Sequence, residues 1–214
     1  MRVGVLGGSF NPAHEGHRHV ARIALRRFGL DQVWLMVSPG NPLKPARGMA
    51  PFAERLESAR RIADGRHILA TGLERAIGTR HTWATLARLH RLFPRVEFVW
   101  LMGADNLEHF ASWQRWRRIA AHTALGVLPR PEHNMAALAG PAAHRLRPAR
   151  RPARQAPLLA SATTPAWIFL PAAQNALSAT ALRAARSSPQ GERARIETSV
   201  PGLCPASATE GEAP

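Results

Sequence analysis

Two histidines near the start of the chain, His14 and His17, have the residue type and spacing best suited to chemistry. They are three residues apart at the predicted start of a helix, so their side chains share one face. A helix N-terminus disfavours an imidazolium but attracts phosphate. We therefore predict a phosphate site here. The histidines alone leave two alternatives open, a pair of metal ligands and a solvated pair without a role.

The segment before the histidines, Gly7-Gly8-Ser9-Phe10, follows a short apolar run at residues 3–6. It lacks the G-x-G-x-x-G spacing of a dinucleotide fingerprint, and no Gly-Lys-Ser/Thr follows as in a P-loop. Its glycines would let a phosphate approach the backbone, although an ordinary turn between a strand and a helix would read the same way.

The rest of the chain alternates apolar runs of strand length with helical periodicity. This alternation predicts an α/β fold, an open, doubly wound, Rossmann-like parallel sheet in a single domain over residues 1–186. We expect strands at 3–6, 32–37, 67–70, 96–102, 123–128 and 167–170. We expect helices over 20–28, from Pro51, from an N-cap at Thr82, over the tryptophan-rich stretch 110–119 and from an N-cap at Ser178.

Ligands of such sheets bind beyond the carboxyl ends of the strands, where the strand order reverses. This rule predicts that four polar loops share one edge of the sheet: 7–16, 38–44, 103–106 and 174–180. Residues 129–157, rich in Pro, Ala, Arg and His without sustained periodicity, are expected to form a long surface excursion that is partly mobile. Residues 187–214 are expected to form a disordered tail.

Composition limits the class of protein. The net charge is +15 and the pI about 11.9, but Lys44 is the only lysine and tyrosine is absent. A compositional bias of the source genome therefore explains the charge better than a polyanion-binding surface does. A single cysteine, Cys204, argues against a disulfide or a thiolate zinc site. Without a signal peptide or an apolar run of about 18 residues, we expect a cytoplasmic protein with no membrane partner.

The segment Gly8 to His17, GSFNPAHEGH, resembles the G-[TS]-F-[DN]-P-x-H-x-G-H signature of the nucleotidyltransferase superfamily, and within it of the bacterial nicotinate-mononucleotide adenylyltransferases. Further segments resemble that family in the same order, from about residue 1 to 185. They are 38–44 (SPGNPLK), 79–86 (TRHTWATL), 103–107 (GADNL), 110–119 (FASWQRWRRI) and 177–183 (LSATALR).

The resemblance implies that ATP and nicotinate mononucleotide react to give deamido-NAD and pyrophosphate. Mg²⁺ is implied to bridge the ATP phosphates through water and substrate oxygens, without a metal site in the protein. The residues implied to act on ATP are His14, His17 and Arg183 at the reacting and leaving phosphates, Gly8, Ser9, Phe10, Gly16, Ser178 and Thr180 around the phosphates, and Gly103 and Asp105 at adenosine. Those implied to bind the mononucleotide are Lys44, Thr82 and Trp113. For Trp113, packing in the core is the alternative.

Some positions depart from the family pattern. Ala179 stands where the family has the middle serine of its second phosphate box, and His81 where it has an aromatic tyrosine; the tail lacks its closing aromatic helix. Acceptors such as nicotinamide mononucleotide or phosphopantetheine, or a cytidylyltransferase activity, are the alternatives within the superfamily. A basic nucleic-acid-binding module is the less favoured alternative outside it. Neither the preference for acid or amide nor the oligomeric state follows from the sequence.

Overall fold

The computed structural model describes residues 1–40 and 48–171. Their six strands form one parallel sheet in the order β3-β2-β1-β4-β5-β6, and the order reverses between β1 and β4. The strands are β1 (Arg2–Gly8), β2 (Gln32–Val37), β3 (Ile68–Thr71), β4 (Glu97–Gly103), β5 (Ala124–Leu128) and β6 (Trp167–Phe169). The predicted doubly wound α/β fold in a single domain is confirmed.

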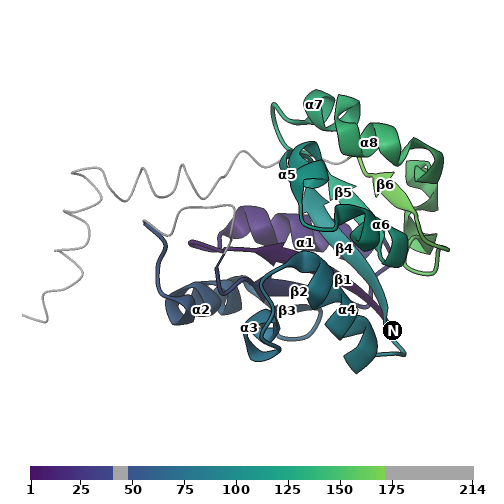
Figure 1. Ribbon diagram of the computed structural model, residues 1–214. Coiled ribbons are helices and arrows are strands. Elements are labelled where there is room, and N and C mark those ends of the chain that lie inside the picture. The colour runs from purple at the N-terminus through teal and green to yellow at the C-terminus, as the bar shows by residue number, and fades with distance from the viewer. Residues whose placement is uncertain (41–47, 172–214) are drawn as a thin grey trace, which may run out of the picture. The chain divides into compact units, whose positions relative to one another are not determined.

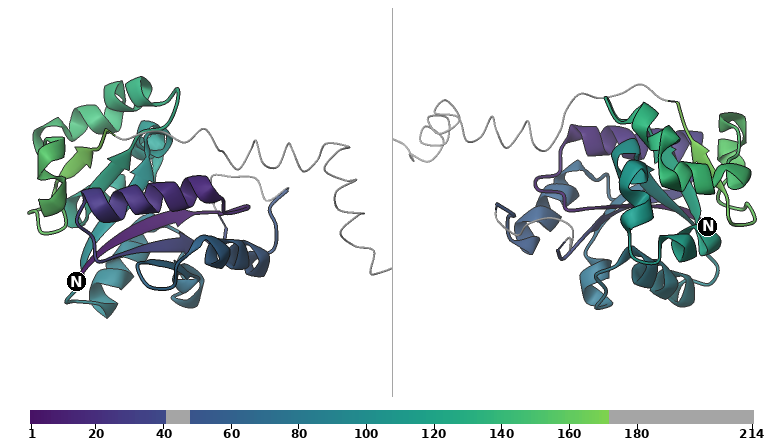
Figure 2. Two further views of the ribbon diagram at one scale, coloured as in Figure 1. Left: turned by 180° about the vertical axis from the view of Figure 1, so that it is seen from behind. Right: turned by 45° about the horizontal axis from the view of Figure 1, so that its top comes forward.

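Helices cover both faces of this sheet, which is why β5 is buried along its whole length and β4 is buried from Phe98 to Met102. Figures 1 and 2 show α1 on one side and α4 and α6 on the other. The helices are α1 (Glu15–Arg27), α2 (Phe52–Ile62), α3 (Leu73–Ala76), α4 (Thr82–Leu92), α5 (Ala104–His109), α6 (Trp116–His122), α7 (Asn134–Ala139) and α8 (Pro141–Arg145), with 3₁₀ turns η1 (Phe110–Ser112), η2 (Arg147–Ala149) and η3 (Ala153–Leu158). None of the described helices is long and apolar enough to cross a membrane.

Two apolar cores fill the space between the sheet and its helices. One packs Ala24 of α1, its C-cap Phe28 and Ile62 of α2 against the sheet, and the other packs Leu89 of α4 and Leu107 of α5 against the opposite face. Each core is built by the inward positions of helices at the 3.6-residue period. The sheet is thereby fixed from both sides, and its loops at the carboxyl edge are held on a rigid base.

The parallel register aligns the carboxyl ends of β1, β2 and β4. Gly8 of β1 pairs with Val37 of β2, and Leu6 of β1 pairs with Leu101 of β4. The loops that follow β1, β2 and β4 therefore leave the same edge of the sheet, as predicted. Residues 41–47 of the second loop and the predicted fourth loop, 174–180, lie outside the described residues.

One helix start agrees with the prediction and one differs from it. α1 begins at Glu15, directly after its N-cap His14, so the two histidines open the helix as predicted, although its apolar periodicity starts only near residue 20. At α4 the N-cap is His81, and Thr82 is the first helical residue. The prediction that Thr82 caps this helix is therefore wrong.

The segment 129–157 is folded, contrary to the expected excursion without secondary structure. It contains α7, α8, η2 and most of η3, and these bury Ala137, Ala142 and Ala156 against the rest of the chain. Its helices are short and their buried positions are alanines, so the hydrophobic contrast between the two faces is small. Tertiary packing against α5, rather than sequence periodicity, fixes this segment.

Adjacent alanines of α7 test this packing. Ala137 is fully buried, whereas Ala136 is exposed. We expect Ala137→Asp to lower the free energy of unfolding by about 2–4 kcal/mol, because it buries an unpaired charge. Ala136→Asp is the matched control and should change it by less than about 0.5 kcal/mol. Urea denaturation measures both values, and equal effects would contradict a packed α7.

Candidate active site

His14 and His17 cap the start of α1 reciprocally. The Gly16 N–H donates to Nδ1 of His14 at 3.1 Å, and the His14 N–H donates to Nδ1 of His17 at 3.2 Å. The ring centroids are 3.9 Å apart. This is the arrangement of a capping box, with imidazole nitrogens in place of the usual oxygens. It confirms that the two side chains share one face, and it explains why the helix begins where it does.

Both imidazoles are held in the neutral form. Burial, together with repulsion from a protonated His14 and from Arg130, lowers the pKa of His17 to about 3. Burial and Arg130 also lower the pKa of His14. A neutral ring whose Nδ1 accepts a hydrogen bond carries its proton on Nε2. The pair therefore offers two Nε2–H donors, which suit an anionic ligand at a helix N-terminus.

The loop between β1 and α1 is shaped by the packing of its aromatic residue. The Phe10 side chain is buried, and its backbone adopts the left-handed conformation, with φ of 47°. Its ring centroid lies 4.9 Å from that of His17. A side chain at Gly8 would press on the Phe10 ring, and one at Gly7 would collide with Trp100. The two glycines are thus required by close packing as well as by the expected approach of phosphate.

Arg55 of α2 is a buried cation that sequence reasoning missed. It is 2% exposed, and its guanidinium donates to the carbonyl oxygens of Ser9 (2.7 Å), Ser38 (2.8 Å) and Pro39 (3.2 Å), while its Nε donates to Ala50 (2.9 Å). Five donors in a rigid fork suit this task. The signal was present, because Arg55 occupies the apolar helix face shared by Ala59 and Ile62. Arg55 thereby ties the loops after β1 and β2 together.

The end of β4 brings Gly103 and Asp105 next to a second missed cation, Arg130. The Asp105 Oδ1 is 3.6 Å from the Arg130 Nε, and this buried oxygen accepts no hydrogen bond from the described residues. A Cβ at Gly103 would lie 3.0 Å from Arg130 Cγ and would collide with the Asp105 carboxylate. Arg130 also acts on both histidines, so it links the ends of β1 and β4 electrostatically. Its position two residues after β5 was the available signal.

Two residues expected at the mononucleotide lie on the opposite face from α1. Thr82 starts α4, and no side chain caps that helix. Trp113 follows η1 and is half-buried, with its ring centroid 5.4 Å from Phe110 and 6.3 Å from Trp100. The core packing considered for Trp113 is therefore present, and a role in binding stays a prediction.

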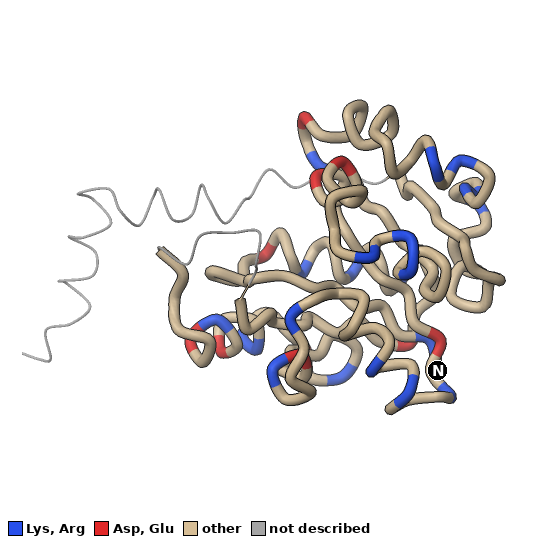
Figure 3. Tube along the Cα trace, viewed as in Figure 1, with Lys and Arg blue, Asp and Glu red and all other residues tan. Residues whose placement is uncertain are grey.

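The remaining predicted site residues, Lys44, Ser178, Thr180 and Arg183, lie outside the described residues. Across residues 1–40 and 48–171, no group of three or more His, Cys, Asp or Glu side chains is placed to hold a metal ion. Figure 3 shows the basic residues in several separate places, including α2, α6 and the segment after α8.

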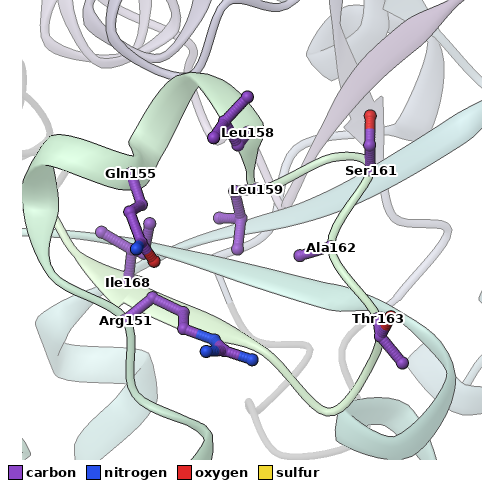
Figure 4. Close-up of a pocket in the computed structure, with 8 residues that line it drawn as sticks. All are labelled: Arg151, Gln155, Leu158, Leu159, Ser161, Ala162, Thr163 and Ile168. Atoms are coloured by element: carbon purple, nitrogen blue, oxygen red, sulfur yellow. The ribbon is translucent and has the colours of Figure 1, made fainter.

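A cavity of about 370 Å³ lies elsewhere, between η3, β6 and the loop that joins them. Figure 4 shows Arg151 as the one charged side chain among those that line it. Ser161, another lining residue, hydrogen-bonds to Glu97 at the amino end of β4. The cavity is thus at the opposite edge of the sheet from the histidine pair, and its mostly apolar lining offers little chemistry.

A model of the cytidylyltransferase-like family matches residues 5–185, and the chain belongs to this family. Two relatives, each named probable nicotinate-nucleotide adenylyltransferase, are similar over most of their length. The protein from Gluconobacter oxydans (strain 621H) is 60% identical over 86% of this chain and 94% of its own. The protein from Gluconacetobacter diazotrophicus is 58% identical over 86% of this chain and 85% of its own.

Solved structures resemble the fold at low sequence identity. Plasmodium falciparum nicotinic acid mononucleotide adenylyltransferase complexed with NaAD has a TM-score of 0.66 at 14% identity, covering 91% of this chain and 89% of that one. The same enzyme complexed with APC has a TM-score of 0.61 at 16% identity, covering 86% and 82%. This likeness establishes the shared Rossmann-like architecture.

Stability should depend on pH through His17. Its pKa is about 3 in the folded protein and near 6.5 when unfolded, so the unfolded state binds the extra proton between these values. The stability present above pH 6.5 is therefore lost as the pH falls, by about 2 kcal/mol at pH 5. His17→Gln keeps an oxygen acceptor for the His14 N–H and should reduce the loss between pH 7.5 and 5 by this amount. Urea denaturation at both pH values measures it; an unchanged loss would contradict a neutral, buried His17.

Proposed function

We propose that the protein transfers the adenylyl group of ATP to nicotinate mononucleotide, giving nicotinate adenine dinucleotide and pyrophosphate in NAD biosynthesis. The observation that carries the proposal is the neutral, reciprocally capped pair His14 and His17 at the carboxyl end of β1. The names of the two relatives favour nicotinate mononucleotide, the acid form, as the acceptor.

The proposed reaction requires no general base. A phosphate oxygen of the mononucleotide attacks the α-phosphorus of ATP, a new P–O bond forms, and the bond to the β-phosphate oxygen breaks as pyrophosphate leaves. The second pKa of such a phosphate is about 6, so the nucleophile is already ionised at pH 7. The enzyme must position the two phosphates in line and offset the charge of the five-coordinate α-phosphorus.

The histidine pair and Arg130 suit this electrostatic task. The Nε2–H groups of His14 and His17 would donate to the ATP phosphates, with His17 at the reacting one. The Gly8, Ser9 and Phe10 N–H groups and Gly16 would line the same phosphates. Arg130 supplies a fixed positive charge beside both rings. Ser178, Thr180 and Arg183, from the second phosphate box, would bind the leaving pyrophosphate.

One carboxylate oxygen of Asp105 accepts no hydrogen bond from the described residues, which supports its proposed role at adenosine. Oδ1 is buried without a hydrogen-bond donor in the described part of the chain, and a ribose hydroxyl would supply one. Gly103 would leave the space that this carboxylate and the nucleoside need. For the acceptor, the Thr82 N–H in the uncapped first turn of α4 would bind the nicotinate carboxylate, Trp113 would stack on the pyridine ring, and Lys44 would lie near the phosphate.

We infer that Mg²⁺ enters with ATP as part of the substrate. It prefers oxygen ligands and keeps several of its waters, and the phosphates supply those oxygens. The imidazole nitrogens near the phosphates are poor ligands for it, which fits a cation held by substrate and water.

The proposed reaction is tested by pyrophosphate release. The protein is incubated with ATP, Mg²⁺ and, in parallel, nicotinate mononucleotide, nicotinamide mononucleotide or phosphopantetheine. We expect fastest release with the nicotinate form. His17→Ala should lower kcat by about 10²-fold or more, the scale for losing one well-placed donor to developing charge. His144→Ala, at an exposed histidine of α8, should leave kcat unchanged. A normal kcat for His17→Ala would remove this residue from the chemistry.

Trp113 is tested against a second tryptophan with a similar core contact. Trp116 packs on the same Phe110 ring, at 5.7 Å, and is also half-buried. Trp113→Leu should raise the KM for the mononucleotide by about tenfold, within the range for losing one stacked aromatic contact. Trp116→Leu should leave that KM within about twofold, because it loses packing alone. Equal effects on KM would mean that Trp113 acts through the core and does not stack on the substrate.

A further inference from the structure

Three side chains join the start of α4 to the turn before α6. Trp83 Nε1–H donates to the Gln114 Oε1 at 2.9 Å. The Arg115 guanidinium lies over the Trp83 ring, with its Cζ 4.2 Å from the ring centroid. This distance is well inside the range of a cation–π contact, whereas Arg118 is farther from the same ring, at 5.7 Å. We call Trp83, Gln114 and Arg115 the clasp.

The backbone at Arg115 is unusual for its residue type. Its φ of 53° and ψ of 34° lie in the left-handed region, which favours glycine. Arg115 is exposed, and within the described part of the chain its guanidinium forms no ion pair. Its contact with the Trp83 ring therefore explains why a long cationic side chain occupies this position. Uncommon backbone conformations of this kind cluster at binding sites.

The clasp lies directly beside two proposed binding groups. Trp83 follows Thr82, whose N–H would bind the nicotinate carboxylate, and Gln114 follows Trp113, whose ring would stack on the pyridine. Those two groups belong to different elements, α4 and the turn after η1, and no hydrogen bond joins their side chains among the described residues. Because Trp83 follows Thr82 and Gln114 follows Trp113, the contacts of the clasp would fix the distance between the Thr82 amide and the Trp113 ring.

We propose that Trp83, Gln114 and Arg115 are positioning residues that set the spacing between the Thr82 amide and the Trp113 ring, and so determine the affinity for the pyridine mononucleotide. The proposal rests on the proposed function. Preorganisation of this kind lowers the cost of ordering two loops when the ligand binds. Neither the hydrogen bond nor the cation–π contact of the clasp involves the loop Gly8–His17, so its loss should weaken acceptor binding and leave ATP binding unchanged.

The variant Arg115→Gly distinguishes an effect of the clasp on binding from an effect on folding. Glycine adopts the observed backbone without strain, so the variant should unfold at an equal or higher urea concentration than the wild type. The loss of an exposed cation–π contact should raise the Kd for nicotinate mononucleotide by about threefold to fivefold, measured by titration calorimetry. Trp83→Leu also removes the hydrogen bond and should raise that Kd by about tenfold. The Kd for ATP should stay within about twofold in both variants.

A double variant and a matched control complete the test. Trp83→Leu with Arg115→Gly should bind the mononucleotide as weakly as Trp83→Leu alone, because the two substitutions remove the same contact. Arg117→Ala is the control, since this exposed arginine of α6 lies over Trp116 and not over Trp83. It should leave both Kd values unchanged. Independent, multiplicative effects of the two clasp substitutions would overturn the proposed coupling.

Binding and turnover distinguish the two proposals. A wild-type protein that binds the mononucleotide but releases no pyrophosphate would overturn the proposed function and leave the clasp to be judged from the Kd series. An active wild type whose Arg115→Gly and Trp83→Leu variants keep its Kd would overturn the clasp alone. Equal losses of mononucleotide and ATP affinity would also overturn it, because they indicate a general structural role. A wild type that does not bind the mononucleotide would overturn both.

Discussion

The reciprocal capping of α1 by His14 and His17 is the interaction on which the site depends. Each imidazole accepts a backbone N–H at the first turn of the helix, so neither Nδ1 can carry the proton of a neutral ring. Burial and the charge of Arg130 keep both rings neutral. The same contacts therefore start the helix, choose the tautomer and leave two N–H donors for an anion. The two nitrogens of each imidazole thus have separate tasks, because Nδ1 stabilises the helix start and Nε2–H is left for the ligand.

Two arginines near this pair have different structural roles. Arg55 is almost fully buried and satisfies its guanidinium with backbone carbonyl oxygens from the loops after β1 and β2. A buried cation without a carboxylate partner in the described residues is expensive, so its retention is explained by the geometry that it imposes on these loops. Arg130 is partly exposed and lies beside Asp105, and its charge lowers the pKa of both histidines, so the same charge would act on a bound phosphate. Arg55 therefore holds the two loops at the edge of the sheet in place, whereas Arg130 supplies positive charge there.

Separate segments at the carboxyl edge of the sheet divide the work of a two-substrate reaction. The loops at the ends of β1 and β4 carry the histidines, Gly103 and Asp105, which would receive ATP. The start of α4 and the turn before α6 carry Thr82, Trp113 and the clasp on the side that would receive the mononucleotide. The strand order, which reverses between β1 and β4, is what brings these segments to one edge. This arrangement lets acceptor affinity change without altering the phosphate site.

The sequence by itself determined the sheet and the location of the site. Strong apolar runs such as 96–102 and the glycine loop before His14 are local signals, and the parallel order followed from their alternation with helices. Tertiary structure decided what local periodicity cannot encode. Residues 129–157 fold because alanines of α7 and α8 fit against α5, although alanine gives little contrast between helix faces. Arg55 joins the site through loop carbonyls that lie 16–46 residues away in the sequence. Arg130 joins it through Asp105, which lies 25 residues away. Such distant contacts, like the stacking of Arg115 on Trp83, depend on how elements pack and leave no pattern in the local sequence.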